Sequence, residues 1–307
     1  MHDPDARAIA PPGGAARSVG AEVWPVCAAD GARSELLVVR PATAPALAPM
    51  LYWLPAMGVP AKHYLPLAQA LAGHGIGMAL HEWRGLGSSD RRAHRRSDWN
   101  YRTLLCEDLP AGIAVLRAQA PSAPWFLGGH SLGGQLACLA AALERERPRG
   151  LALVASGAPY WRQLDRRWLI RLAYLGAPVV ARLVGHLPGR RLGFGGNEAR
   201  GVIADWARSG RTGRYAARGL QVDLERALAE LALPVLGVRL RDDWLGPAAS
   251  LDWLLGKMPR APRSVRVIAP PDLGGVPADH FAWMKAPDAV AATLSGWIAG
   301  VEAAPRA

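Results

Sequence analysis

A serine flanked by glycines, at the junction of a strand and a helix, constrains this chain more than any other feature. The apolar run Trp125–Leu127 leads into Gly129-His130-Ser131-Leu132-Gly133, and an Ala/Leu-rich helix is expected over Leu132–Glu146. This is the G-x-S-x-G pattern of a nucleophile elbow, which exposes a serine hydroxyl on a sharp strand-to-helix turn. The glycines let neighbouring backbone approach without Cβ clashes. The pattern therefore predicts a nucleophilic Ser131 at a helix N-terminus that can stabilise developing negative charge.

Short apolar stretches alternate with helical patterns on both sides of this turn. Such alternation is typical of a parallel sheet flanked by helices, and an Ala-Asp-Gly turn at residues 29–31 predicts an antiparallel hairpin at its edge. The expected strands are Ala21–Ala28, Ser34–Arg40, Pro49–Leu54, Ile76–Trp83, Trp125–Leu127, Leu151–Ala155, Pro234–Leu240 and Ser264–Pro270. The other expected helices are Tyr64–Ala72, Asp98–Gln119, Ala249–Lys257 and Asp288–Ala299. We therefore predict an α/β fold with a mostly parallel, eight-stranded sheet flanked by helices.

The alternation stops between Pro159 and Leu231. This stretch is rich in Trp and Arg and contains helical pieces and Gly/Pro breaks, but no strand-like run. The simplest account is a helical cap inserted after the sixth strand. The predicted organisation is a disordered leader at 1–20, a core at 21–158 and 232–300, a cap at 159–231 and a tail at 301–307. The leader lacks the basic start and apolar centre of a signal peptide.

A serine nucleophile on an elbow needs an acid and then a histidine further along the chain. Asp242 and Asp243 follow the strand Pro234–Leu240, whereas the preceding strand ends without an acid. His280 stands in a short loop ahead of the last helix, after both the elbow and the acids. Adjacent side chains point in opposite directions, so only one of the two carboxylates can reach this histidine. We predict His280 as the general base and Asp243 as its partner, with Asp242 as the fallback.

An oxyanion needs a second backbone donor besides the Leu132 N–H. In an elbow enzyme this donor comes from the turn after the third strand of the sheet. Met57-Gly58-Val59 occupies that place, and Gly58 permits the sharp turn. We predict the Val59 N–H as the donor, with the Met57 N–H as the fallback.

With these residues in place, the chain resembles the α/β-hydrolase superfamily from about Ala21 to Ala299. The loop His81-Glu82-Trp83-Arg84-Gly85-Leu86-Gly87-Ser88-Ser89 looks like the family's D-x-R-G-x-G-x-S loop, with Glu82 where aspartate is usual. Further details resemble a bacterial branch labelled only as predicted hydrolases; they are Ala56–Val59, Ser156–Trp161 and Leu187–Gly193. The resemblance implies the fold and serine chemistry, and it implies almost nothing about the substrate.

The expected reaction is hydrolysis of a carboxylic ester or thioester through an acyl-enzyme on Ser131, without metal or organic cofactor. The partner is then a small acyl substrate. Two alternatives remain open: an acyltransferase that uses the same triad with an acceptor other than water, and a non-catalytic ligand-binding protein. Ser in place of Asp at the elbow disfavours a haloalkane dehalogenase. The candidate substrate contacts are Met57, His130, Trp161, Trp206 and Trp244, although packing of the cap onto the core explains the tryptophans equally well.

The net charge of +11 invites a nucleic-acid or membrane-surface partner. The basic residues are spread along the chain, and only Lys62, Lys257 and Lys285 are lysines. We therefore expect no nucleic-acid binding and favour attraction of an anionic substrate to the site. The 307-residue chain has no apolar run of 18 residues, so we expect no membrane span and a cytoplasmic protein of undetermined oligomeric state. Cys27, Cys106 and Cys138 lack metal-ligand spacing and are expected to be buried apolar residues.

Overall fold

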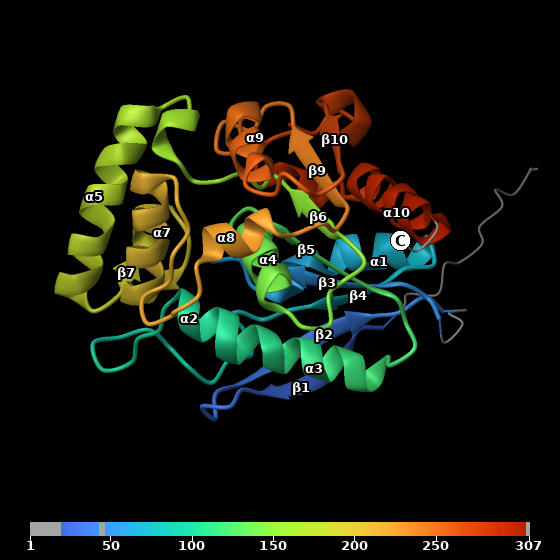
Figure 1. The fold of residues 1–307 in the computed structure, drawn as a ribbon, viewed down its shortest axis with the longest axis horizontal. Coiled ribbons are helices and arrows are strands. Elements are labelled where there is room, and N and C mark those ends of the chain that lie inside the picture. The colour runs from blue at the N-terminus through green and yellow to red at the C-terminus, as the bar shows by residue number, and fades with distance from the viewer. Residues whose placement is uncertain (1–19, 43–46, 305–307) are drawn as a thin grey trace, which may run out of the picture.

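The computed structural model describes residues 20–42 and 47–304. They form a twisted eight-stranded sheet with helices packed around it (Figure 1). The strands lie in the order β1-β2-β4-β3-β5-β6-β9-β10. The predicted leader lies outside the described residues except for Gly20. The strand bounds are β1 Glu22–Cys27, β2 Arg33–Val39, β3 Met50–Leu54, β4 Gly77–Leu80, β5 Trp125–His130, β6 Leu151–Val154, β9 Val235–Leu240 and β10 Arg263–Ile268.

The antiparallel part of this sheet is its N-terminal edge. β1 pairs with β2 across the predicted hairpin, and β2 pairs antiparallel with β4. The other neighbouring strands of the described sheet are parallel. The predicted α/β class and the mostly parallel eight-stranded sheet are confirmed. Parallel strands end at the same edge of a sheet, and this edge carries the loops that follow β3, β5, β6 and β9.

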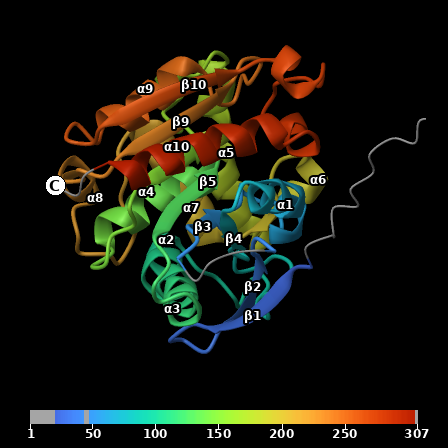
Figure 2. The same ribbon diagram turned by 90° about the vertical axis from the view of Figure 1, so that its right-hand side faces the viewer.

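Helices cover both faces of the sheet (Figure 2). α1 and α10 pack on one face through an apolar cluster that includes Leu71 and Leu294, and α3, α4, α8 and α9 pack on the other. Their bounds are α1 Leu65–Gly73, α2 Tyr101–Thr103, α3 Leu109–Gln119, α4 Leu132–Leu143, α8 Leu224–Ala229, α9 Ala248–Gly256 and α10 Asp288–Ala303. Single 3-10 turns lie at Ala61–Tyr64, Trp161–Gln163, Pro270–Leu273 and Ala282–Lys285.

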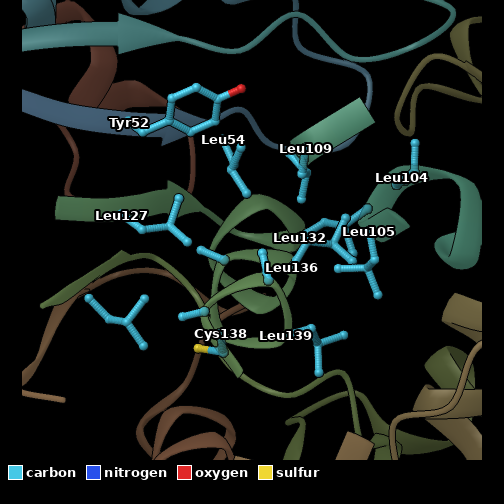
Figure 3. Close-up of a cluster of buried hydrophobic side chains, with 14 of the residues drawn as sticks. Tyr52, Leu54, Leu104, Leu105, Leu109, Leu127, Leu132, Leu136, Cys138 and Leu139 are labelled. Carbon is cyan, nitrogen blue, oxygen red and sulfur yellow. The ribbon is translucent and has the colours of Figure 1, made fainter. Parts of the chain in front are cut away.

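Helix α4 runs through the apolar layer on one face of the sheet. Every residue from Leu132 to Ala141 is buried, as expected for a helix that is apolar on all sides. Figure 3 shows Leu132, Leu136 and Leu139 of this helix packed among side chains from the sheet and from the segment that leads into α3. The enclosed helix gives the preceding residue, Ser131, a rigid support.

The helix predicted over Asp98–Gln119 begins at Tyr101 and contains a π-helical turn at Leu104–Asp108. Asn100 caps its start, because its side chain accepts a hydrogen bond from the Thr103 N–H at 3.2 Å. Pro110 follows the π turn, and a proline has no N–H to complete the regular i to i−4 pattern. The irregular turn accommodates this missing donor.

Residues 159–231, which we call the insertion, leave the sheet after β6 and return before β9. They contain α5 Arg167–Val184, α6 Gly189–Leu192 and α7 Arg200–Thr212, and α5 and α7 lie side by side at one end of the molecule (Figure 1). The prediction that this segment lacks strands is wrong, since β7 Leu187–Pro188 pairs with β8 Asn197–Glu198. Strands of two residues are too short to show an alternating pattern. α8 lies within the predicted cap range, yet it packs against α4 in the main core.

Two other expectations need correction. β5 continues to His130 instead of ending at Leu127, because glycines fit between the adjacent strands; a Cβ on Gly128 would lie 2.7 Å from Ala152 O. Cys138 is buried and Cys106 is half-buried, but Cys27 is exposed on the edge strand β1, against the prediction that all three are buried.

Candidate active site

Ser131 stands between β5 and α4 in a strained conformation. Its φ of 54° and ψ of −120° are unusual for a residue with a side chain. A Cβ on Gly129 would lie 2.5 Å from Gly133 C, and a Cβ on Gly133 would lie 2.0 Å from Leu54 O. The two glycines of the motif are therefore required by the close approach of three backbone segments. The contact with Leu54 also brings the N-terminus of α4 against the end of β3.

Ser156 supports this turn from the end of β6. Its Oγ lies 3.0 Å from Ser131 O, and a Cβ on Gly134 would lie only 2.1 Å from that hydroxyl oxygen. The preceding residue, Ala155, also has a positive φ of 46°. The sequence shows Ser156 as part of a family-like stretch, but it does not show that its hydroxyl contacts the elbow. The strained turn at Ser131 and the strained turn at Ala155 are thus joined by a hydrogen bond.

His280 and Asp243 form a hydrogen-bonded pair. His280 Nδ1 donates to Asp243 Oδ2 at 2.8 Å, and both side chains are buried. Asp243 Oδ1 accepts the backbone N–H groups of Leu245 at 2.9 Å and Gly246 at 3.0 Å. The neighbouring Asp242 points to solvent and pairs with Arg241. Of the two candidate acids, Asp243 is the one that contacts the histidine.

The His280 ring lies beside the elbow. Its centroid is 4.9 Å from that of His130, the residue immediately before Ser131. The Trp283 indole donates to His280 O at 3.0 Å, and Asp279 caps the turn by accepting the N–H groups of Phe281 and Ala282. The loop that carries His280 is therefore fixed at its backbone.

Tyr64 links the elbow to the turn after β3. Its hydroxyl accepts the Ala56 N–H at 2.9 Å and donates to His130 Nδ1 at 2.8 Å. Burial raises the pKa of this hydroxyl, so it stays protonated and able to donate. Burial, together with the nearby His280, lowers the pKa of His130 well below its usual range. Nothing in the sequence around Tyr64 signals this role, since the partners are brought together by the fold.

His130 was expected to contact substrate, and this expectation needs correction. The side chain is 0% exposed and enclosed by Tyr64, Trp283 and His280. It presents no surface to a ligand in this structure. Its place at the end of β5, one residue before the outward-facing serine, directs it into the core because successive residues face opposite ways.

In the turn after β3, the backbone N–H that was predicted to be free, that of Val59, is already hydrogen-bonded. The Val59 N–H donates to Ala56 O at 3.1 Å and so closes the turn itself. The Met57 N–H has no acceptor within the described part of the chain. Leu132 is the first residue of α4, where a backbone N–H lacks a helical partner. Among the described residues, the N–H groups of Leu132 and Met57 are thus two donors without a backbone acceptor at the elbow and at the turn after β3.

The insertion rests directly on this turn. Gly58 has a φ of 75°, and a Cβ there would lie 2.0 Å from Gly196 N. The Met57 side chain packs in the apolar clusters of both the core and the insertion, beside Trp206. The turn is therefore held between the sheet and the insertion.

The Gly-rich loop after β4 contains two buried charged side chains. Arg84 donates to Asp108 Oδ2 at 3.0 Å and to Asp30 Oδ2 at 2.6 Å, so it ties the loop to the π turn and to the β1–β2 hairpin. Glu82 accepts the Ala61 N–H at 3.2 Å, and burial raises the pKa of its carboxyl to about 7. A Cβ on Gly87 would overlap this carboxylate, which explains the glycine in the motif.

The candidate tryptophans have different surroundings. Trp161 is buried within the insertion, and the half-buried Trp206 packs edge-on against Tyr174 at 4.7 Å. These two contribute mainly to packing of the insertion. Trp244 is 41% exposed in the loop of Asp243, with the Arg166 guanidinium 4.8 Å from its ring centroid.

A groove of about 540 Å³ opens beside the turn after β3 and the His280 loop. Its apolar wall includes Val59, Phe281 and Met284, and its basic side chains are Lys62, His63 and Lys285. Neither lysine forms an ion pair within residues 20–42 and 47–304, whereas Lys257 is paired with Glu225. No group of three or more His, Cys, Asp or Glu side chains in the same described ranges is arranged to hold a metal ion.

An eight-stranded sheet with a strained serine after β5 and a His–Asp pair after later strands defines an α/β-hydrolase-fold enzyme. Residues 51–207 match the family described as serine aminopeptidase, S33, and the chain belongs to this family.

Comparison with curated proteins finds a pimeloyl-[acyl-carrier protein] methyl ester esterase from Nitrosomonas europaea. It is 30% identical over 167 residues, which cover 50% of this chain and 65% of that protein. The chain thus matches less than two thirds of this relative.

Solved structures share the fold at low identity. The esterase domain of a Rhodothermus marinus protein has a TM-score of 0.59 and 20% identity, with 91% of this chain and 97% of that chain covered. An esterase from Exiguobacterium antarcticum has a TM-score of 0.60 and 15% identity, with coverages of 91% and 100%. A haloalkane dehalogenase from Agrobacterium tumefaciens scores 0.61 at 16% identity, with coverages of 92% and 97%. The fold alone therefore does not specify the reaction.

Proposed function

We propose that this enzyme hydrolyses a carboxylic ester or thioester through an acyl-enzyme on Ser131. The observation that carries the proposal is the strained Ser131, next in sequence to a histidine whose ring packs on the Asp243-bound His280. Backbone strain in a residue with a side chain is typical of functional positions. The relative named as a methyl ester esterase supports ester cleavage.

In the proposed reaction, His280 Nε2 removes the Ser131 proton as Oγ attacks the carbonyl carbon. The oxyanion accepts hydrogen bonds from the Leu132 and Met57 N–H groups. His280 then protonates the leaving alcohol or thiol, and water repeats the sequence to release the acid and restore Ser131. Asp243 orients the ring by accepting from Nδ1, which leaves Nε2 directed away from the carboxylate.

This proposal revises the second oxyanion donor from Val59 to Met57. A backbone N–H that closes a turn cannot also stabilise an oxyanion without opening that turn, and the Val59 N–H is engaged with Ala56 O. The Met57 N–H lacks such a partner within the described residues. Met57 follows Pro55 by two residues, and the carbonyl oxygen of Pro55 would lie 2.5 Å from a Cβ on Gly133 in α4. The two donors would then come from the elbow and from the turn fixed by Tyr64.

The insertion serves as the cap in this proposal. Its Gly195–Gly196 segment lies against Gly58, and Arg166 lies over Trp244 beside the acid. We place its end at residue 223 rather than 231, because α8 packs against α4 in the core. Such a cap would shape the acyl site and exclude water from it.

The groove lined by Lys62, His63 and Lys285 favours a substrate that carries negative charge. An ester or thioester with an anionic group, such as a carboxylate or phosphate, would place that group near Lys62 and Lys285, which have no ion-pair partner among the described residues. This fits the excess of positive charge over the whole chain.

The test is hydrolysis of p-nitrophenyl esters from acetyl to palmitoyl, and of acyl-CoAs, by the wild type and by Ser131→Ala. We expect turnover to fall by about 10⁴-fold or more in the variant, with an unchanged circular dichroism spectrum. A fluorophosphonate probe should label the wild type at Ser131. Labelling without turnover of any ester would favour transfer to another acceptor, and failure to label would exclude a serine nucleophile.

A further inference from the structure

Helix α5 exposes a continuous apolar stripe to solvent. Trp168, Leu172 and Leu183 are 58%, 66% and 67% exposed, although residues of this size are usually buried. Spacings of 4 and 11 residues, close to one and three helical turns, place them on one side of the helix. The other exposed apolar side chains of this stripe are Leu169, Leu175, Val179, Val180 and Val184.

The stripe points away from the rest of the molecule. α5 has only two buried residues, Tyr174 and Ala181, and both face the neighbouring helix α7. Figure 1 shows α5 at the outer end of the molecule, with α7 between it and the sheet. Contiguous exposed apolar surface of this extent marks an interaction site.

Arginines border the stripe, and acids are absent from this helix. Arg167, Arg171 and Arg182 lie on α5 between its apolar and buried sides, and Arg190 and Arg191 follow on α6. The α5 sequence contains no Asp or Glu. The Arg171 guanidinium lies 5.5 Å from the Trp168 ring centroid, so one cation sits at the edge of the apolar surface. A helix with an apolar face, a tryptophan and flanking arginines has the character of an interfacial membrane helix.

We propose that the α5 stripe binds the surface of an anionic phospholipid bilayer. The apolar side chains would enter the boundary between headgroups and acyl chains, and the arginines would contact anionic headgroups. No helix in residues 20–42 or 47–304 is long and apolar enough to cross a membrane, so α5 would lie in the plane of the surface. A second copy of this chain is a poorer occupant, because it would bring two sets of arginines together without acids to pair with them.

The N-terminal end of α5 lies near the loop that carries the candidate acid. Trp168 lies 5.1 Å from Trp161 between ring centroids, and Arg166, just before α5, lies over Trp244. Trp244 follows Asp243 directly in the sequence. Binding through α5 would hold the acid loop near the lipid surface. The inference concerns binding and does not depend on the proposed reaction.

The test is co-sedimentation of the full chain with vesicles of phosphatidylglycerol and phosphatidylcholine, at 50 and 500 mM salt. We expect binding to anionic vesicles that weakens at high salt, and an at least tenfold loss of partitioning in the variant Leu172→Ser/Leu183→Ser. Val265→Ser/Val267→Ser on β10 is the matched control, since it removes two exposed aliphatic side chains elsewhere and should bind like the wild type.

Two results would overturn the proposal. One is equal partitioning of the wild type and the α5 variant. The other is no vesicle binding, with light scattering that shows a wild-type dimer and a monomeric variant, which would identify a second copy as the occupant. Because both leucines are exposed, the variant should fold; an Arg167→Gln/Arg182→Gln variant provides a second test, with a loss confined to low salt.

Discussion

Helices α4 and α5 are both rich in apolar residues, but their surroundings are opposite. α4 has ten buried residues among its 12, whereas α5 has two among its 18. α4 is apolar on every side and is enclosed by the sheet, α8 and the segment before α3. α5 has an apolar side and turns it outward. Apolar content therefore builds the rigid support of the site in one helix and an exposed apolar surface in the other.

The largest expected effect tests whether catalysis depends only on residues of the buried core and not on the exposed side of α5. Asp243→Asn should lower kcat/KM by about 10³–10⁴-fold, because the amide can no longer orient the His280 ring in the required tautomer. Asp242→Asn and Leu175→Ser should change kcat/KM for a soluble short-chain ester by less than about twofold, since both side chains face solvent. Steady-state kinetics would measure all three. Equal losses in the two aspartate variants would remove Asp243 from the mechanism.

The same substitution in each helix sharpens the comparison in terms of stability. Gly133→Ala in α4 should destabilise the protein by about 3 kcal/mol, because the new Cβ meets Leu54 O at 2.0 Å. Gly176→Ala in α5 meets nothing within 4 Å and should stabilise by about 0.5–1 kcal/mol through helix propensity. Urea unfolding monitored by circular dichroism gives both values. A loss of stability in both variants would contradict the open surroundings of Gly176.

A smaller effect concerns the loss of folding stability at low pH, which we expect from a histidine buried in the core. Burial lowers the pKa of His81 to about 3, against about 6.5 when unfolded. Its contribution to stability is complete above pH 6.5 and falls by about 1.4 kcal/mol per pH unit as the pH drops toward 3. Glu82, with its pKa raised to about 7, opposes this by gaining stability as the pH falls from 7 to 4.5.

Comparison of the wild type with His81→Gln isolates the histidine. The variant should lose about 1 kcal/mol less than the wild type between pH 6.5 and 5.5, whatever its stability at pH 7.5. The measurement is urea unfolding at pH 5.5, 6.5, 7.5 and 8.5, and the two proteins should show the same slope above pH 7.5. Parallel curves at all four values would show that His81 does not titrate on unfolding.

The smallest expected effect concerns the groove. Lys62→Ala/Lys285→Ala should raise KM for an ester with an anionic group by about three- to tenfold at low salt, with little change in kcat, because only attraction of the charge is lost. KM for p-nitrophenyl acetate should stay unchanged. Arg263→Ala/Arg266→Ala on β10 removes the same charge elsewhere and serves as the control. Equal effects in the two double variants would assign the change to net charge instead of the groove.

Features encoded over short distances could be predicted from the sequence. The strand–serine–helix junction, the order of the strands along the chain and the alternation that leads to a parallel sheet all follow from local patterns. The buried ring of His130 and the contacts of Tyr64 depend on segments far apart in sequence. The Val59 N–H donates to Ala56 O within the same turn, but the residues of that turn do not specify which of its N–H groups stays free. The periodicity of α5 indicates an amphipathic helix, but it carries no information on whether the apolar side faces the protein or the solvent.

The contact between Gly58 and Gly195–Gly196 has a consequence for exchanging parts between relatives. Backbone meets backbone there with no side chain between them, so a foreign insertion with any larger residue at this point would push the turn that carries Met57. A chimera that receives the insertion of another hydrolase is therefore expected to change rate and substrate range together. The insertion and the turn after β3 therefore have to be exchanged together. A chimera intended to alter substrate selectivity alone should receive both segments from the same donor protein.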